Sequence, residues 1–173
     1  MRALSYEPGR APTGANAAGG RHGAMAKVQA SAQRTIDAPA ERVYGYLADM
    51  HQHPRFLPPA FSDFQVEEGG VGAGSVTRFS VTAGGRTRSY RMRVTEPEPG
   101  RRLVESDTNS SLVTTFDVEP QGARSIVRIS TSWDGAGGIG GFFERTFAPK
   151  ALRRIYLDEL ERLDAYARAQ QAA

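Results

Sequence analysis

The feature that most restricts the fold of this chain is a long stretch, from about residue 77 to residue 133, in which polar and apolar side chains alternate. Such alternation has the period of a β-strand and gives each strand one apolar and one polar face. The pair Gly84-Gly85 interrupts the pattern as a hairpin turn does. We therefore predict an antiparallel sheet of successive hairpins with one buried face.

Four segments carry the alternation most clearly. The predicted apolar faces consist of Thr77, Phe79 and Val81; of Tyr90, Met92 and Val94; of Leu112, Thr114, Phe116 and Val118; and of Val127, Ile129, Thr131 and Trp133. A further strand is predicted at residues 100–107, where the facing is ambiguous because Leu103 shares its parity with Glu105 and Asp107.

Other elements flank this stretch. Residues 27–36 are predicted to form a first strand, and Asp37 and Pro39 then indicate the start of a helix with Glu41 in its first turn. Three prolines at positions 54, 58 and 59 leave room for at most a short second helix.

The chain ends in a predicted long amphipathic helix. Its apolar stripe consists of Leu152, Ile155, Tyr156, Leu160, Leu163 and Ala167. Pro149 is expected to kink this helix, or to separate it from a preceding turn that carries Phe142, Phe143 and Phe147. A sheet with one apolar face and a helix with one apolar stripe bury both when the sheet curls around the helix. We predict this α+β arrangement, with a cavity between the two.

Composition indicates one globular domain, since 173 residues with 39% hydrophobic side chains can build a single core. Residues 1–24 are rich in Gly, Ala and Pro, and we interpret them as a disordered tail, which places the domain at 25–173 and makes Met25 a hypothetical start. No apolar run approaches the roughly 20 residues of a membrane span. No secretory signal is evident either, so a cytoplasmic protein is expected.

Charge and cysteine content argue against several classes of function. Outside the tail, 19 basic residues face 18 acidic ones, so the basic character does not predict nucleic-acid binding. The chain has no cysteine, which excludes disulfides, thiol nucleophiles and thiolate metal sites. We expect no cofactor, and either a monomer or a homodimer.

The segment 49–59, DMHQHPRFLPP, allows two interpretations. Asp49, His51 and His53 alternate like metal ligands, but a metal site needs three or four ligands and the remaining histidine lies in the tail. We therefore interpret the histidines as exposed polar residues of a loop and expect no metal. Phe56 and Leu57 are instead predicted to form a lip that packs on a ligand.

A second motif is the sequence GAGGIG at residues 135–140, which satisfies the dinucleotide-binding pattern G-x-G-x-x-G. That pattern works only within a βαβ unit, and here no strand follows the helix. We interpret the segment as a flexible connector before the final helix.

With its elements in this order, the chain resembles the START-like superfamily, in particular its polyketide cyclase/dehydrase and lipid-transport branch (SRPBCC). The resemblance covers residues 27–168. It is carried by IDAPAERVYGYLADMHQHPRFLP at 36–58, GVGAGSVTRF at 70–79, VTEPEPGRRLV at 94–104 and the glycine-rich approach to the final helix.

The resemblance implies a helix-grip fold, in which a curved seven-stranded antiparallel sheet grips the C-terminal helix around a hydrophobic tunnel, with two short helices after the first strand. It also implies a ligand such as a lipid, isoprenoid or polyketide. The residues expected to contact the ligand are Phe56, Leu57, Phe79, Val81, Tyr90, Met92, Phe116, Ile129, Trp133, Phe147, Leu152 and Tyr156.

Candidates for catalysis are few, because the chain has no G-x-S-x-G motif and its domain histidines lie in one short segment. Tyr90, Arg88 and Glu105 could move protons, since burial shifts the pKa of a carboxyl or phenol. In the alternative interpretation, Glu105 and Asp107 are solvated residues at a strand end and Tyr90 is part of the tunnel wall.

Three functions follow from these patterns. The first is binding, and possible transport, of a hydrophobic small molecule. The second is a polyketide cyclase/dehydratase-type enzyme, for which a buried ionisable group deep in the tunnel would argue. The third is a protein-interaction module, for which a filled core and a contiguous exposed apolar patch would argue.

Overall fold

The computed structural model describes residues 27–135 and 138–172, the side chains of 138–147 excepted. The predicted tail at 1–24, Met25 and part of the GAGGIG segment therefore lie outside the described residues. In chain order the elements are β1 (Lys27–Ile36), α1 (Ala40–Ala48), the 3₁₀ turn η1 (His53–Arg55), β2 (Phe61–Glu68), β3 (Val76–Ala83), β4 (Arg86–Glu98), β5 (Arg102–Asp107), β6 (Val113–Gln121), β7 (Arg124–Asp134) and α2 (Gly138–Gln171).

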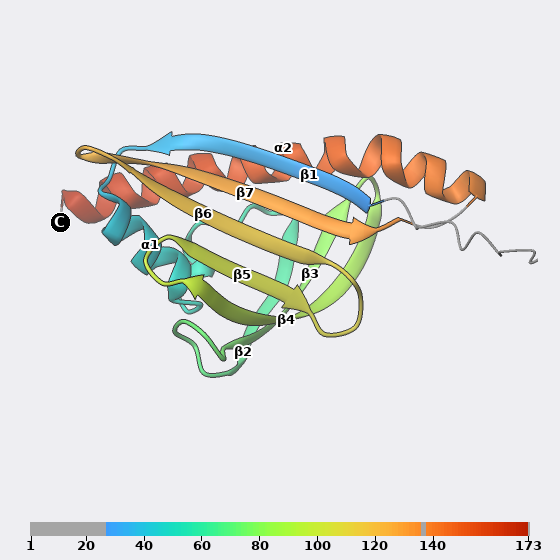
Figure 1. Cartoon of the computed structure of the whole chain (residues 1–173), viewed down its shortest axis with the longest axis horizontal. Coiled ribbons are helices and arrows are strands. Elements are labelled where there is room, and N and C mark those ends of the chain that lie inside the picture. Colours follow the sequence, from blue (N-terminus) through green and yellow to red (C-terminus); the bar gives the residue numbers. More distant parts are fainter. Residues whose placement is uncertain (1–26, 136–137, 173) are drawn as a thin grey trace, which may run out of the picture.

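The seven strands form one antiparallel sheet in the order β1-β7-β6-β5-β4-β3-β2. From β2 to β7 every strand pairs with its neighbour in sequence. β1 forms the other edge of the sheet and pairs along its whole length with β7. Figure 1 shows the sheet curving beneath α2. The predicted helix-grip fold is confirmed, with η1 in place of a second short helix.

The helix α2 runs across the concave side of the sheet and packs mainly along β1 (Figure 1). Its buried positions recur at helical spacing and include Tyr156, Leu160, Leu163 and Ala167, as the apolar stripe predicted. Pro149 lies inside the helix and does not divide it. Because α2 follows the β1 edge, the inward faces of the central strands meet it through long side chains rather than through close backbone packing.

The apolar interior is divided into two clusters. The larger one joins β1, α1, the inward faces of β5 to β7, and α2. The smaller one consists of Phe79, Val81 and Met92 from β3 and β4, with half-buried apolar residues around it. Ile155, Phe64 and Leu112 contact both clusters and so mark the junction between them.

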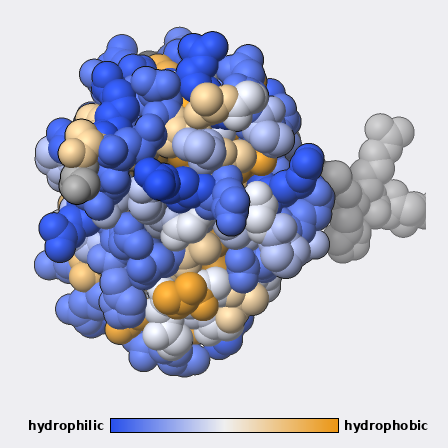
Figure 2. Space-filling view, turned by 90° about the vertical axis from the view of Figure 1, so that its left-hand side faces the viewer, coloured by the Kyte–Doolittle hydropathy of each residue, from blue (hydrophilic) through white to orange (hydrophobic). Residues whose placement is uncertain are grey.

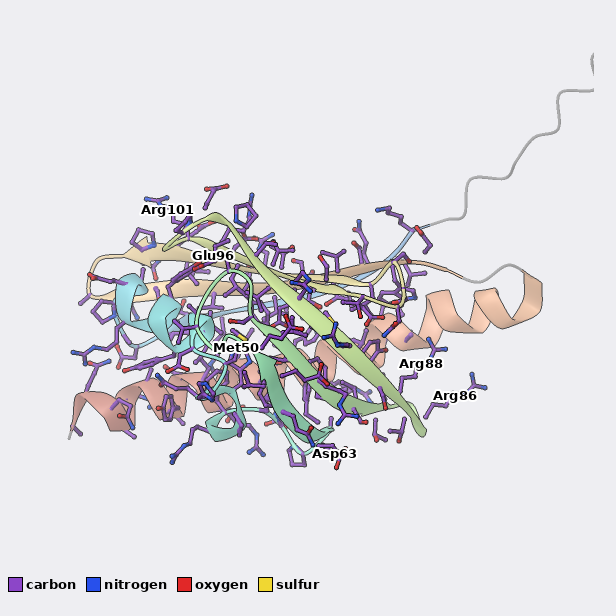
Figure 3. All side chains as sticks on the ribbon, turned by 90° about the horizontal axis from the view of Figure 1, so that it is seen from below. Met50, Asp63, Arg86, Arg88, Glu96 and Arg101 are labelled. Carbon is purple, nitrogen blue, oxygen red and sulfur yellow. The ribbon has the colours of Figure 1, made fainter. Side chains whose placement is uncertain are left out.

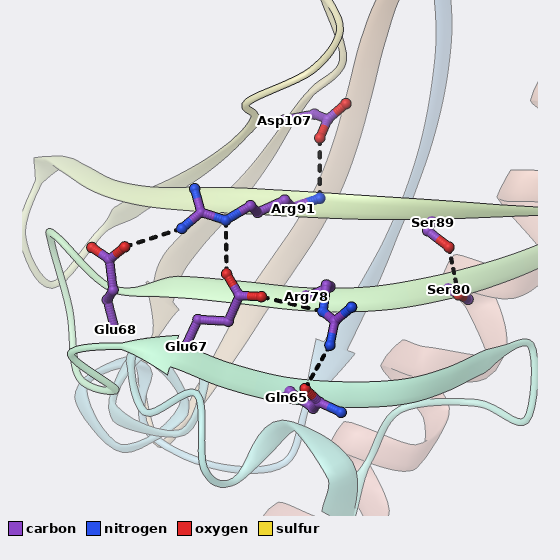
Figure 4. Close-up of polar contacts among 8 residues, drawn as sticks. All are labelled: Gln65, Glu67, Glu68, Arg78, Ser80, Ser89, Arg91 and Asp107. Atoms are coloured by element: carbon purple, nitrogen blue, oxygen red, sulfur yellow. Dashed lines mark hydrogen bonds and ion pairs between the residues drawn. The ribbon is translucent and has the colours of Figure 1, made fainter.

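The convex face of the sheet is polar and charged. Glu67 bridges Arg78 and Arg91 at 3.2 and 2.7 Å, and Arg91 also contacts Glu68 at 3.0 Å (Figure 4). These ion pairs explain the polar half of the alternation, because the outward side chains of β2, β3 and β4 form a charged ladder on the surface.

Large exposed apolar residues are rare on the part of the chain that the structure describes, where Val71 alone is in this class. The end of the molecule that Figure 2 presents is mainly hydrophilic, with small separate apolar areas. The contiguous patch that would support an interaction module is therefore not seen on the described surface. None of the described helices combines the length and apolar character needed to cross a bilayer.

Candidate functional site

A row of polar side chains crosses the inward face of the sheet under α2. Glu105 on β5 pairs with Thr114 on β6, and Thr114 pairs with Thr131 on β7. Directly opposed residues in an antiparallel sheet share a face, so all three point towards α2, and all three are buried. Val94 and Ala30 continue the same row on either side with apolar side chains.

Hydroxyl groups connect this row to the helix. The Oγ1 atoms of Thr114 and Thr131 are 2.8 Å apart, and Thr131 Oγ1 lies 2.5 Å from the Tyr156 hydroxyl oxygen. Burial raises the pKa of Tyr156, so its phenol keeps its proton at neutral pH. The three hydroxyls form a hydrogen-bonded chain from the middle of the sheet to α2.

Two carboxyl groups complete the polar cluster. Glu105 is 6% exposed and Glu159, one helical turn after Tyr156, is 3% exposed. Burial raises the pKa of Glu105 to about 7. Burial, with the Glu105 and Asp158 charges, raises the pKa of Glu159 to about 8. Both groups therefore exchange protons near neutral pH, where general acids and bases work best. We call Glu105, Thr114, Thr131, Tyr156 and Glu159 the polar cluster.

Beside the polar cluster, aromatic rings line the inward faces of β2, β3 and β4. Phe79 stacks on Phe64 with centroids 5.9 Å apart and contacts Phe61 at 5.4 Å and Tyr90 at 6.1 Å. Ile155, which precedes Tyr156 on α2, packs against the same cluster as Tyr90, and this brings the aromatic group to the part of the helix that carries the polar cluster. The combined site has apolar walls and one polar end, as small-molecule sites commonly do.

The structure places the residues that were predicted to bind ligand in several environments. Phe79, Val81, Met92 and Tyr90 lie in or against the smaller cluster, and Tyr156 belongs to the polar cluster. Among the remaining residues, Phe116, Ile129 and Trp133 are buried in the larger cluster, Leu152 and Leu57 are half-buried, and the side chain of Phe147 lies outside the described residues.

Phe56 occupies a different place from the lip that was predicted. Its side chain is completely buried and its ring centroid lies 5.2 Å from that of His53 and 5.9 Å from that of Tyr166. In this position Phe56 anchors the segment after α1 to the core and to α2. Whether it contacts a ligand remains a prediction.

The prediction that both domain histidines are exposed is wrong for His53. His51 is exposed, but His53 is 3% exposed, and its Nε2 lies 2.9 Å from the Leu47 carbonyl oxygen. Its ring also stacks on Phe64. The aromatic neighbours and the carbonyl stabilise a neutral ring that donates from Nε2. Among the described residues, no group of three His, Cys, Asp or Glu side chains could hold a metal ion.

We expect His53 to make the fold sensitive to acid. Burial lowers the pKa of His53 below its ordinary value of 6.5, so protonation favours the unfolded chain. The stability that the neutral ring contributes is complete above about pH 6.5 and is lost as the pH falls below it. Urea unfolding at pH 7 and pH 5 should show that the change in stability on acidification is less unfavourable for His53→Gln than for the wild type, since the contribution of the buried carboxyl groups is common to both proteins. An equal change in both proteins would contradict this role, and His51→Gln is the exposed control.

The three catalytic candidates differ in how far they are buried. Arg88 and Arg86 are exposed at the far end of β4, and Figure 3 shows them remote from α1, with Arg86 projecting away from the ribbon. Tyr90 is half-buried on the inward face. Glu105 is buried, so its interpretation as a solvated strand-end residue is wrong. Asp107 remains partly exposed and accepts hydrogen bonds from the Ser110 hydroxyl and the Arg91 amide.

Sequence reasoning missed Glu159 altogether and treated Thr114 and Thr131 only as members of an apolar face. A signal for Glu159 was present, because it follows Tyr156 by three residues and precedes Leu163 by four, which places it beside the buried stripe. Charged residues at such positions are usually at the border of the stripe, so spacing alone did not show that this one is buried.

Comparison with known proteins identifies the family. The sequence model described as polyketide cyclase/dehydrase and lipid transport matches residues 25–168. The chain belongs to this family. The comparison with curated proteins found no match.

Several solved structures are similar to this one over most of the chain. The solution structure of the KanY protein (ms6282) is 38% identical with a TM-score of 0.74, and the match covers 83% of this chain and 99% of that one. The Zhui aromatase/cyclase from Streptomyces sp. R1128 is 18% identical with a TM-score of 0.66, over 83% and 94% of the chains. A START superfamily protein from Mycobacterium smegmatis is 14% identical with a TM-score of 0.64, over 80% and 98%. The last two show the fold alone.

Proposed function

We propose that this family member binds a largely apolar small molecule between the inward face of the sheet and α2, as a carrier or binding protein. The observation that carries the proposal is the division of the interior into two clusters. In the larger cluster the fully buried residues outnumber the partly buried apolar residues packed against them, whereas Phe79, Val81 and Met92 of the smaller cluster are outnumbered by their partly buried neighbours. Apolar surface that remains partly uncovered between the sheet and α2 is available to a bound molecule.

The energetics of such binding are favourable without special chemistry. Removing about 300 Å² of apolar surface from water contributes roughly 7 kcal/mol, from which association subtracts several kcal/mol. The net gain falls short of the roughly 8 kcal/mol of micromolar affinity, so this burial alone gives weak, millimolar binding of an aromatic or isoprenoid guest that covers the smaller cluster. The polar cluster then selects the orientation of the guest rather than supplying most of the affinity.

A fluorescence titration with the neutral dye N-phenyl-1-naphthylamine tests this proposal. Ile155 lies at the junction of the two clusters, so Ile155→Trp should fill the space that the dye needs and weaken binding by at least about tenfold. Leu157→Trp is the matched control, because Leu157 lies on the same helix but packs against the larger cluster only. Equal affinities for the two variants and the wild type would refute the proposed location.

A second candidate function is a polyketide cyclase/dehydratase-type enzyme, and the polar cluster is the observation that favours it. A dehydration needs one group to remove a proton next to a carbonyl and another to protonate the departing hydroxyl. Glu105 and Glu159, with pKa values of about 7 and 8, could serve as this base and acid. Incubation with a β-hydroxy ketone, followed by mass spectrometry, would show loss of water by the wild type and no loss by Glu105→Gln.

A further inference from the structure

We propose that the guest of this site carries a cationic nitrogen, which lies between Glu105 on β5 and Glu159 on α2. The inference rests on the proposed function, because it names the class of molecule that the same site binds. Its basis is that both residues are more than nine-tenths buried, while no hydrogen bond from a described residue acts on either carboxyl group.

The third buried carboxyl group of the described chain shows how unusual this is. Asp164 accepts a hydrogen bond from the Asp37 amide at 2.8 Å and forms ion pairs with Arg168 at 3.2 Å and Arg34 at 4.0 Å. Asp164, a structural carboxylate, thus has both a hydrogen-bond donor and positively charged partners. Among the described residues, Glu105 and Glu159 have neither a donor nor a basic partner, although an unpaired buried charge is costly.

Among the described residues, the charged and titratable groups that act on Glu159 and Tyr156 are acidic or phenolic. Glu105 and Asp158 act on Glu159, while Glu159 and Tyr90 act on Tyr156. No basic side chain of the described residues contributes to the electrostatics of either glutamate. Among the described residues, therefore, no positive charge compensates for these two carboxyl groups.

A proton compensates this deficit while the site is empty, and a cation on the guest would replace it. A cationic nitrogen meets the requirement because its charge offsets the carboxylates, and a nitrogen that carries N–H groups also supplies the missing donors. The rings of Phe79 and Tyr90 border the same site and favour a cation through their π faces. A neutral guest would leave both carboxyl groups dependent on protons.

Two probes of the same shape separate charge from apolar burial. The (2-naphthylmethyl)trimethylammonium ion and neutral 2-neopentylnaphthalene differ only in a nitrogen that replaces a carbon. Isothermal titration calorimetry should show that the cation binds at least about tenfold more tightly at pH 8 than at pH 6. Repeating the titration in buffers of different ionisation enthalpy should show proton release, and the quaternary cation has no proton of its own to lose.

Variants assign the effect to the two carboxyl groups. Glu105→Gln and Glu159→Gln should each weaken binding of the cation by about tenfold or more and leave the affinity for the neutral isostere unchanged. Glu161 is exposed on the same helix, so Glu161→Gln should change neither affinity. If the neutral isostere binds as tightly as the cation and no proton is released, the cationic guest is ruled out while the proposed function stands. If neither probe enters the site, the proposed function fails as well.

Discussion

Shortening Leu160 to alanine is expected to lower the free energy of unfolding by about 2–5 kcal/mol. Leu160 is completely buried on the stripe of α2 that faces the sheet, between the polar cluster and Leu163. Its removal leaves a cavity where the helix and the sheet meet, and a close-packed core relaxes only partly around such a cavity. Chemical denaturation with a spectroscopic readout measures the loss directly.

Glu161→Ala is the control for this prediction, because Glu161 is the exposed neighbour on the same helix and its replacement should change stability by less than about 0.5 kcal/mol. If Leu160→Ala were as mild as the control, α2 would not be gripped by the sheet as described. A large effect of Glu161→Ala would point to the same conclusion.

The stability of the fold is expected to fall as the pH rises from about 5 to 8. The folded-state pKa values of Glu105 and Glu159, about 7 and about 8, lie above the ordinary value of 4.5, so the folded chain holds protons that the unfolded chain releases. The stabilisation is complete below about pH 4.5 and is lost as the pH rises through the folded-state values. At about 1.4 kcal/mol per pKa unit, the two shifts together set an upper limit of about 8 kcal/mol on the loss.

Urea unfolding between pH 5 and pH 8 provides the measurement. Glu105→Gln and Glu159→Gln remove the titrating group while keeping its size, and the stability of each should depend less on pH than that of the wild type. His53 acts in the opposite direction below about pH 6.5, so the comparison is made between each variant and the wild type at the same pH. Unchanged pH dependence in both variants would show that the two carboxyl groups are not buried as the structure places them.

Much of the fold was predictable because alternation with period two assigns each side chain of a strand to one of the two faces of the sheet. Phe79, Met92, Phe116 and Ile129 were each assigned to the inward face from period two alone, and all four are buried. The range of β1 was also predicted correctly. The family resemblance supplied the number of strands and the curvature of the sheet around the C-terminal helix, which short-range sequence patterns do not determine.

β2 shows where the period fails. Phe61 and Phe64 both lie against the smaller cluster, although an odd spacing should place them on opposite faces. The strand bulges between Ser62 and Gln65, and Asp63 takes a positive φ of 56°. An inserted residue shifts the parity of everything that follows, and a bulge of this kind leaves no clear sign in the sequence.

The candidate site was less accessible to sequence reasoning, for an electrostatic reason. Glu105 shares its parity with the buried Leu103 and also with the partly exposed Asp107, and general preference places a carboxylate in water. Its burial depends on α2 and Glu159, which are remote in the sequence and meet the strand only in the folded protein. His53 was misplaced for a related reason, since the Leu47 carbonyl that pairs with it becomes available only once α1 ends.

The most direct test of the central claim is nuclear magnetic resonance of methyl-labelled protein saturated with N-phenyl-1-naphthylamine. A dye bound between the sheet and α2 should give intermolecular nuclear Overhauser effects to the methyl groups of Met92, Val81 and Ile155, which line the inward face and α2. Contacts confined to surface methyl groups such as that of Val71, or none at all, would contradict a guest held between the sheet and the helix.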